Sequence, residues 1–202
     1  MRKERAQYAG TWERRREIID AALACFVEDG FVNVTMKDIR VRSGASNGSI
    51  YHHFKSKEQL AAAVYLEGIT DYQQGLLSEL VKNPGARDGI YAMVRYDLHW
   101  VKRNPAWTYY LFQMRHADFM QTAEKSILEK NKIFVSGIAK WFSDAVKSGK
   151  LRTLPPELYI SLILGPCQEF ARHWILRDRK ADIESAIEEI SKAAWNALKA
   201  AK

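Results

Sequence analysis

Apolar residues recur every three or four positions along most of this chain, with polar residues between them. That spacing is typical of amphipathic helices, and only 11 glycines and 5 prolines interrupt it in 202 residues. The breaks fall where glycine and proline lie beside asparagine, aspartate or serine, which favour turns. The pattern therefore predicts an all-α protein with helices over residues 13–29, 35–43, 46–53, 56–80, 87–103, 122–147, 157–177 and 181–199.

Three helix starts follow one another closely between residues 35 and 59. Thr35 and Ser46 fit helix N-caps, because their hydroxyl groups can accept hydrogen bonds from free backbone N–H groups. Ser56, followed by Gln59, has the spacing of a capping box that opens a long helix. Gly44 can adopt the left-handed conformation that a sharp turn requires. Two short helices joined by a tight turn, with a third directly after, predict a helix-turn-helix module.

The second short helix is suited to enter the major groove of DNA. Ile50 is placed to pack against Ile39 of the preceding helix, while the N-terminal part offers small and hydrogen-bonding side chains. We expect base contacts from Asn47, Gly48, Ser49 and His52. We expect contacts to the DNA backbone from Thr35, Lys37, Ser46, Tyr51, His53, Lys55 and Lys57.

The stretch Gly44-Ala-Ser-Asn-Gly-Ser-Ile-Tyr-His-His-Phe-Lys-Ser-Lys57 resembles the signature of the TetR family of transcriptional regulators. That signature runs from a glycine turn through Tyr-x-x-Phe to a lysine that opens a connecting helix. The resemblance implies an N-terminal three-helix DNA-binding domain and a larger C-terminal helical domain for ligand binding and dimerisation. The chain departs from the family at Arg40, where alanine is usual, so we expect Arg40 to extend outward or to tilt the helix pair.

These observations divide the chain into three parts. We expect a basic N-terminal arm over residues 1–12, a helix-turn-helix DNA-binding domain over residues 13–57, and a helical ligand-binding and dimerisation domain over residues 58–202. The arm can lie along a DNA groove or remain a solvated tail, and the sequence leaves both open.

Aromatic residues concentrate between Trp100 and Phe142. As a group they exceed what a small helical bundle needs, and the family resemblance implies a cavity in this half of the chain. We therefore expect a pocket for an apolar or aromatic ligand, although core packing is the alternative for each residue singly. The candidate ligand-binding residues are Trp107, Tyr110, Met114, Phe134, Trp141, Cys167 and Phe170.

The last two predicted helices carry long apolar stripes at the end of the chain. Two terminal helices with that much apolar surface favour packing against a second copy, and the family resemblance implies a four-helix bundle formed by two subunits. The candidate dimer residues are Tyr159, Leu162, Ile163, Trp174, Ile187, Ile190, Ala194 and Leu198.

The composition narrows the class of protein further. The net charge is +7, which suits a polyanionic partner. The two cysteines lie far apart in apolar patterns and indicate reduced core thiols, without the spacing of a metal site. We find no set of nucleophile, base and orienting group, so we expect no enzyme activity and no cofactor or metal. The charged N-terminus and the lack of a run of about 20 apolar residues predict a cytoplasmic protein without a membrane segment.

Together these features predict a ligand-responsive transcriptional regulator. The favoured form is a repressor that binds a palindromic double-stranded DNA operator as a homodimer and is released by a small apolar or aromatic effector. One alternative is a helical protein that binds or converts a small molecule and uses its N-terminal module to contact proteins. Another is a regulator that activates transcription or has an architectural role.

Overall fold

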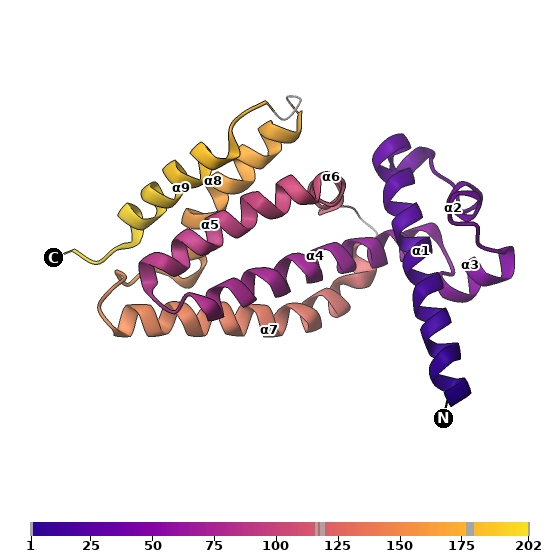
Figure 1. Ribbon diagram of the computed structural model, residues 1–202, viewed down its shortest axis with the longest axis horizontal. Helices are drawn as coiled ribbons and strands as arrows, with labels where there is room; N and C mark the ends of the chain where they lie inside the picture. Colours follow the sequence, from indigo (N-terminus) through magenta and orange to yellow (C-terminus); the bar gives the residue numbers. More distant parts are fainter. Residues whose placement is uncertain (1, 116, 118–119, 177–179, 202) are drawn as a thin grey trace. The chain divides into compact units, whose positions relative to one another are not determined.

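Within the residues that the structure describes, helices follow one another along the whole chain and no strand forms. The computed structural model describes residues 2–115, 117, 120–176 and 180–201, and among these the side chains of residues 11–115, 117, 131–176 and 180–201. The helices, labelled in Figure 1, are α1 (Arg2–Asn33), α2 (Met36–Ser43), α3 (Asn47–His53), α4 (Lys57–Lys82), α5 (Ala86–Arg103), α6 (Pro105–Met114), α7 (Met120–Lys147), α8 (Pro156–Leu176) and α9 (Ile183–Leu198). The predicted all-α class is confirmed.

Two helices differ from the prediction for identifiable reasons. α1 begins at Arg2 instead of Glu13, because residues 3–7 are lysine, glutamate, arginine, alanine and glutamine, which are strong helix formers. The stretch predicted as a separate arm therefore continues α1. The regular helix stops where predicted, at Gly30, whose positive φ of 78° costs glycine little. α6 has no predicted counterpart; it begins at Pro105, which the first turn of a helix tolerates.

The chain divides into two compact units. Unit 1 comprises Met1–Gly68 and Ala106–Ser126, and unit 2 comprises Ile69–Pro105 and Ile127–Lys202. We expected the DNA-binding domain to end at Lys57. Unit 1 extends farther along α4, because Leu60, Ala61 and Val64 are buried in its core.

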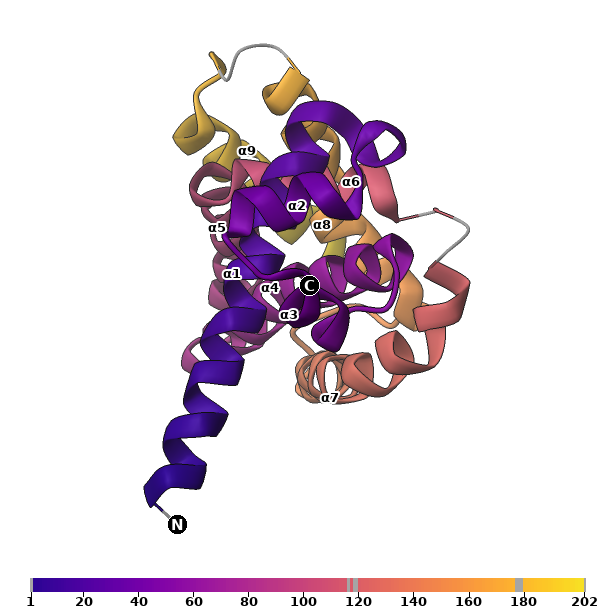
Figure 2. The ribbon, with the colours of Figure 1, turned by 90° about the vertical axis from the view of Figure 1, so that its right-hand side faces the viewer.

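The core of unit 1 joins α1, α2, α3, the start of α4 and α6, and Figure 2 shows α2 and α3 beside α1. Ile39 and Ile50 are both 0% exposed in this core, as the sequence predicted. Tyr110 of α6 stacks on Phe26 of α1 with ring centroids 5.8 Å apart. The Tyr110 hydroxyl also donates a hydrogen bond to the carbonyl of Ala61 at 2.8 Å. α6 is therefore part of the same packed unit as the helix-turn-helix.

Unit 2 is a bundle in which α5 packs against both α8 and α9, and α8 packs against α9 (Figure 1). Two glycines let aromatic rings approach neighbouring helices closely. A Cβ atom at Gly75 would overlap the hydroxyl of Tyr96, and one at Gly89 would overlap the indole of Trp141. The end of α9 is held by a hydrogen bond of 3.0 Å from the Arg152 N–H to the carbonyl of Leu198.

Candidate nucleic-acid interface

A complete capping box opens α2. The Thr35 hydroxyl oxygen accepts a hydrogen bond from the Asp38 N–H at 3.3 Å, and the Thr35 N–H donates to Asp38 Oδ2 at 2.9 Å. Hydrogen bonds from the Thr35 side chain and backbone hold the pKa of the Asp38 carboxyl below its usual value. α2 ends at Gly44, which has a left-handed φ of 63°. The two ends of α2 are therefore fixed by local hydrogen bonds, as the sequence predicted.

α3 has one buried face and one free face. Ser46 caps the helix, its hydroxyl oxygen accepting from the Ser49 N–H at 3.1 Å. Ile50, Ala45 and Phe54 are buried in the core of unit 1 and fix the inner side of the turn and helix. The helix is therefore anchored by its apolar side while its N-terminal residues remain available for contacts.

The residues expected to contact bases lie mainly on the free side of α3. Asn47, Gly48 and His52 are exposed, and Ser49 is half-buried. A Cβ atom at Gly48 would meet no other atom within 4 Å, so the fold itself does not require glycine there. The open space beside Gly48 is consistent with the close approach of a partner.

Lysines and Tyr51 flank this surface. Lys37 of α2, Lys55 after α3 and Tyr51 are exposed. The Lys55 ammonium donates to the carbonyl of Tyr51 at 3.0 Å. Since an ammonium group carries three hydrogen atoms, two remain available for phosphate oxygens. Lys37 and Lys55 therefore remain candidates for contacts to the DNA backbone.

Lys57 is placed differently from Lys55. Its ammonium group donates to the carbonyls of Phe31 at 2.7 Å, Val32 at 3.3 Å and Val34 at 2.8 Å. It also lies 4.5 Å from the centroid of the Phe31 ring. Three carbonyl partners use all three hydrogen atoms of an ammonium group. We therefore revise its role: Lys57 ties the start of α4 to the end of α1.

Two further residues predicted to contact the DNA backbone, Thr35 and His53, are less available for it. The Thr35 hydroxyl donates to Asp38 Oδ2 at 2.6 Å and so is already engaged in the cap. His53 is half-buried, and burial is the main cause that lowers the pKa of its imidazole, followed by the neighbouring His52 and Arg15. A neutral, half-buried His53 is a weaker candidate for a phosphate contact than the exposed lysines.

Two arginines near the motif, Arg42 and Arg15, are paired with carboxylates. Arg42 of α2 forms a two-pronged ion pair with Glu28 of α1, and hydrogen bonding to Arg42 lowers the pKa of Glu28. Arg15 lies 3.5 Å from Glu67 and over the ring of Phe54. Arg40, where the sequence departed from the TetR pattern, is half-buried, and α2 continues through it to Ser43.

Two family models together match residues 18–200 of the chain. The model described as bacterial regulatory proteins of the TetR family matches residues 18–64, and the one described as a tetracyclin repressor-like C-terminal domain matches residues 65–200. The chain belongs to the TetR family. Its members are DNA-binding transcription regulators and not enzymes, which identifies the exposed side of α3 as the surface of chief interest.

Similar proteins span nearly the whole chain. The HTH-type transcriptional activator FasR of Mycolicibacterium smegmatis is 23% identical over 187 residues, which are 92% of this chain and 83% of FasR. A TetR family regulator from Marinobacter aquaeolei has a TM-score of 0.81 at 17% identity, over 97% of this chain and 100% of the other. FadR from Bacillus subtilis, solved in complex with stearoyl-CoA, has a TM-score of 0.77 at 18% identity, over 89% of this chain and 96% of FadR. At these identities the structural likeness shows the TetR fold alone.

The seven residues expected to bind a ligand are divided between the two units of this TetR regulator. Trp107, Tyr110 and Met114 belong to unit 1, where Tyr110 is buried and the other two pack against the core. The remaining four lie in unit 2: Phe134, Trp141 and Phe170 are half-buried, and Cys167 is buried. The first three are therefore accounted for by packing within unit 1.

Most residues expected at the dimer interface are already buried within one chain. The Tyr159 ring stacks on Phe142 at 4.6 Å, and its hydroxyl donates to the carbonyl of Arg152 at 2.8 Å. Among the eight candidates, Leu162 and Ile190 are half-buried, and the buried ones are Tyr159, Ile163, Trp174, Ile187, Ala194 and Leu198. The apolar stripes of α8 and α9 face α5 and each other, which periodicity alone could not distinguish from a subunit interface.

One feature of unit 2, the buried carboxylate of Asp97, was not predicted from the sequence. Asp97 of α5 is 3% exposed and accepts a hydrogen bond from Tyr72. The available signal was a lone carboxylate within the apolar stripe formed by Met93, Val94 and Leu98.

In the described part of the chain, no group of three histidine, cysteine or acidic side chains is arranged to hold a metal ion. None of the helices described has the length and apolar character to cross a membrane.

Proposed function

We propose that this TetR regulator is a homodimeric repressor that binds a near-palindromic operator and is released by a small apolar or aromatic effector. The observation that carries the proposal is the exposure of Asn47, Gly48 and His52 on a helix whose opposite side is fixed by the buried Ile50. Asparagine can bind adenine through two hydrogen bonds, and lysines beside the helix can neutralise phosphates. In a dimer, the two recognition helices would lie about 34–36 Å apart, one turn of DNA.

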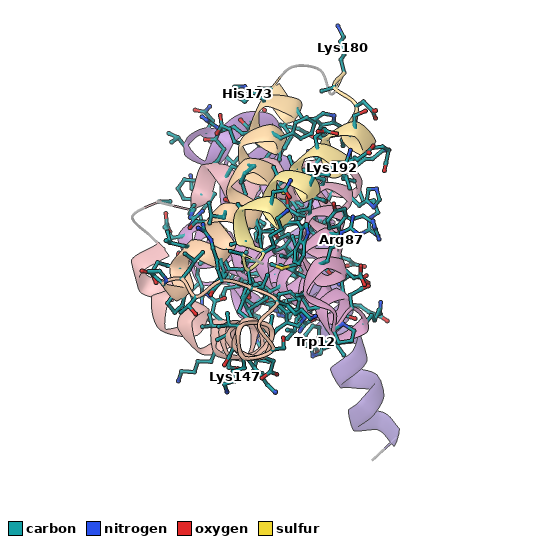
Figure 3. All side chains as sticks on the ribbon, turned by 90° about the vertical axis from the view of Figure 1, so that its left-hand side faces the viewer. Trp12, Arg87, Lys147, His173, Lys180 and Lys192 are labelled. Carbon is teal, nitrogen blue, oxygen red and sulfur yellow. The ribbon has the colours of Figure 1, made fainter. Side chains whose placement is uncertain are left out.

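The proposed dimer uses the outer face of α8. Leu158 and Leu176 are 41% and 66% exposed, and Ser161, Gly165 and Pro166 are also exposed on this helix. Gly165 has open space around its Cα, which suits close packing of a second helix. Polar residues border this face, and His173 of α8 and Lys192 of α9 lie at the surface of unit 2 (Figure 3). A face with apolar and small residues and a polar border is typical of a subunit interface.

The proposed effector site lies in unit 2. Four of the seven predicted ligand residues belong there: Phe134, Trp141, Cys167 and Phe170. FadR of Bacillus subtilis was solved with stearoyl-CoA, which supports an apolar ligand for a protein of this fold. An effector would release DNA only if it binds more tightly to the conformation that cannot fit the operator.

Fluorescence polarisation with labelled fragments of the DNA beside the protein's own coding region tests this proposal. We expect tight binding to one fragment that competitor DNA does not abolish, with affinity falling steeply as salt rises. Analytical ultracentrifugation is expected to give twice the mass of one chain. Salt-independent or absent DNA binding would instead favour a helical protein whose N-terminal module contacts proteins.

An activator is the second candidate, because FasR is named a transcriptional activator. In vitro transcription from the bound promoter separates the two roles. A repressor lowers transcript yield when it is added, and an activator raises it.

A further inference from the structure

Asp97 is a buried carboxylate inside the apolar face of α5. It is 3% exposed, while Met93, Val94 and Leu98 beside it on the helix are 0% exposed. Removing a carboxylate from water costs free energy unless hydrogen bonds or an opposite charge compensate. Asp97 therefore requires partners that an ordinary core residue does not.

Only one of the two carboxylate oxygens of Asp97 accepts a hydrogen bond from a described residue. The Tyr72 hydroxyl donates to Asp97 Oδ1 at 2.5 Å, but Oδ2 has no hydrogen-bond partner among the residues that the structure describes. Burial raises the pKa of Asp97 to about 6, so the carboxyl is mostly ionised at neutral pH. The Asp97 carboxylate acts electrostatically on the nearby Cys167 thiol, and burial is the main cause that raises the pKa of this thiol. Tyr72 and Cys167 are neutral, and no described residue donates a hydrogen bond to Oδ2.

Aromatic rings surround the Tyr72 end of this pair. The ring centroid of Tyr72 lies 5.9 Å from that of Tyr96 and 5.3 Å from that of Trp100, with interplanar angles of 48° and 77°. The Trp100 indole donates to a second carboxylate, Asp71 Oδ2, at 2.9 Å. Aromatic faces attract cations, and several rings set at steep angles beside a carboxylate form a favourable site for an organic cation.

The positive side chains of α5 do not fill this role. Arg95, Lys102 and Arg103 are exposed, on the opposite side of the helix from the buried Asp97. They line, with His99, Tyr96, Ala92 and Glu79, a hollow of about 420 Å³ at the surface of unit 2. Tyr96 therefore lines this hollow and also lies beside the ring of Tyr72.

Other buried polar atoms of unit 2 also lack a partner among the described residues. They are Asn131 Oδ1, Trp141 Nε1 and Ser191 Oγ. These groups are neutral, so leaving one without a partner costs less than leaving a carboxylate oxygen unpaired. Among these four described groups, Asp97 consequently has the most to gain from a bound ligand.

We propose that unit 2 binds an effector with a protonated amine on an apolar body, and that the amine donates a hydrogen bond to Asp97 Oδ2. Tyr72, Tyr96 and Trp100 supply the aromatic surroundings of the ammonium group. This inference rests on the proposed function of the chain as a ligand-responsive regulator and narrows the chemical class of its effector. The bond is a charge-assisted hydrogen bond, which is stronger than one between neutral groups.

Isothermal titration calorimetry with matched ten-carbon probes tests the proposal. The probes are decylamine, decyltrimethylammonium, 1-decanol and decanoate, each below its micelle concentration at pH 7.5. We expect decylamine to bind most tightly, because only it combines positive charge with N–H donors. Asp97→Asn should weaken decylamine binding by about tenfold or more, as expected for a lost charge-assisted bond, and leave 1-decanol unaffected. Asp71→Asn is the matched control and should leave decylamine binding unchanged, because Asp71 is exposed and already bound to Trp100.

The proposal is overturned if the full-length wild-type protein fails to bind decylamine, or if Asp97→Asn binds it as tightly. Tighter binding of decanoate would also overturn it and would point to the basic hollow instead. Tyr72→Phe is a second variant in case Asp97→Asn does not fold. Without the Tyr72 hydroxyl, Asp97 gains more from the ligand, so decylamine should bind more tightly; equal or weaker binding contradicts the proposal.

Operator release separates this inference from the proposed function. The same probes and stearoyl-CoA are added to the protein bound to its operator fragment. If stearoyl-CoA releases the DNA and decylamine does not bind, the regulator proposal stands and the amine proposal fails. If the protein binds no DNA but decylamine binding depends on Asp97, the amine proposal stands and the regulator proposal fails.

Discussion

The Lys57 ammonium lies over the Phe31 ring, 4.5 Å from its centroid, and donates to the Phe31 carbonyl at 2.7 Å. Together with the carbonyls of Val32 and Val34, this contact closes the end of α1 against the start of α4. Lys57 therefore stabilises the DNA-binding module by joining two of its helices.

Lys57→Met keeps the apolar stem and removes the three charge-assisted hydrogen bonds. We expect a loss of about 1–3 kcal/mol in the free energy of unfolding, measured by urea denaturation. Affinity for all DNA sequences should fall because the module is less well formed, while the slope of log affinity against log salt stays constant. A slope reduced by about 0.9 would show that Lys57 neutralises a phosphate after all.

Lys55→Ala is the matched comparison on the neighbouring turn. Lys55 is exposed and uses one of its three ammonium hydrogens within the chain. We expect the salt slope to fall by about 0.9 and the free energy of unfolding to change by less than about 0.5 kcal/mol. Lys57→Met should therefore alter the free energy of unfolding, and Lys55→Ala should alter the dependence of DNA affinity on salt.

Asn47→Ala should mainly relax base preference. Asn47 is exposed at the first turn of α3, where side chains reach base edges. We expect the preference for the operator over a fragment changed at one base pair to drop by about tenfold, with nonspecific binding unchanged. Equal losses on both fragments would assign Asn47 to the DNA backbone.

Gly48→Ala separates folding from DNA approach. The fold leaves open space beside Gly48, and alanine favours helix by about 1 kcal/mol. We expect thermal unfolding to occur at a slightly higher temperature and operator affinity to fall because the new methyl group meets the DNA. Unchanged affinity would mean that the backbone of α3 does not come close to the groove.

Asp97 should make stability depend on pH. Burial raises the pKa of its carboxyl from 3.8 to about 6, so the folded state holds this proton more tightly than the unfolded state. The stabilising contribution is complete below about pH 4 and is lost as the pH rises through about 6. Relative to Asp97→Asn, the wild-type protein should therefore gain about 2 kcal/mol between pH 7 and pH 4. Urea denaturation of both proteins across this range measures the difference, and parallel pH curves would contradict the shift.

Local sequence signals predicted unit 1 well because its helices are fixed by neighbouring residues. Thr35, Ser46 and Gly44 cap or turn the chain through hydrogen bonds within a few positions. Their residue types are enough to locate α2 and α3. The Lys57 contact is different, since its partners lie 23 to 26 positions away in sequence.

The sites of unit 2 were harder to predict because burial there depends on the arrangement of distant helices. Tyr159 and Ile163 show the spacing of an interface, but they face the interior of their own chain. Asp97 falls within the apolar stripe of its helix, but its hydrogen-bond partner Tyr72 lies 25 positions away in sequence and could not be inferred from that stripe. Periodicity locates the apolar side of a helix and does not identify what covers it.

The hydrogen bond from Tyr110 to Ala61 limits how this protein can be dissected. A fragment ending at Gly68 would lack α6 and leave the ring of Phe26 without the Tyr110 ring that stacks on it. Chimaeras with other TetR regulators that exchange only the first 68 residues would pair one protein's α1 with another's α6. Transfer of unit 1 to another protein therefore requires two separate stretches of the gene, those encoding Met1–Gly68 and Ala106–Ser126.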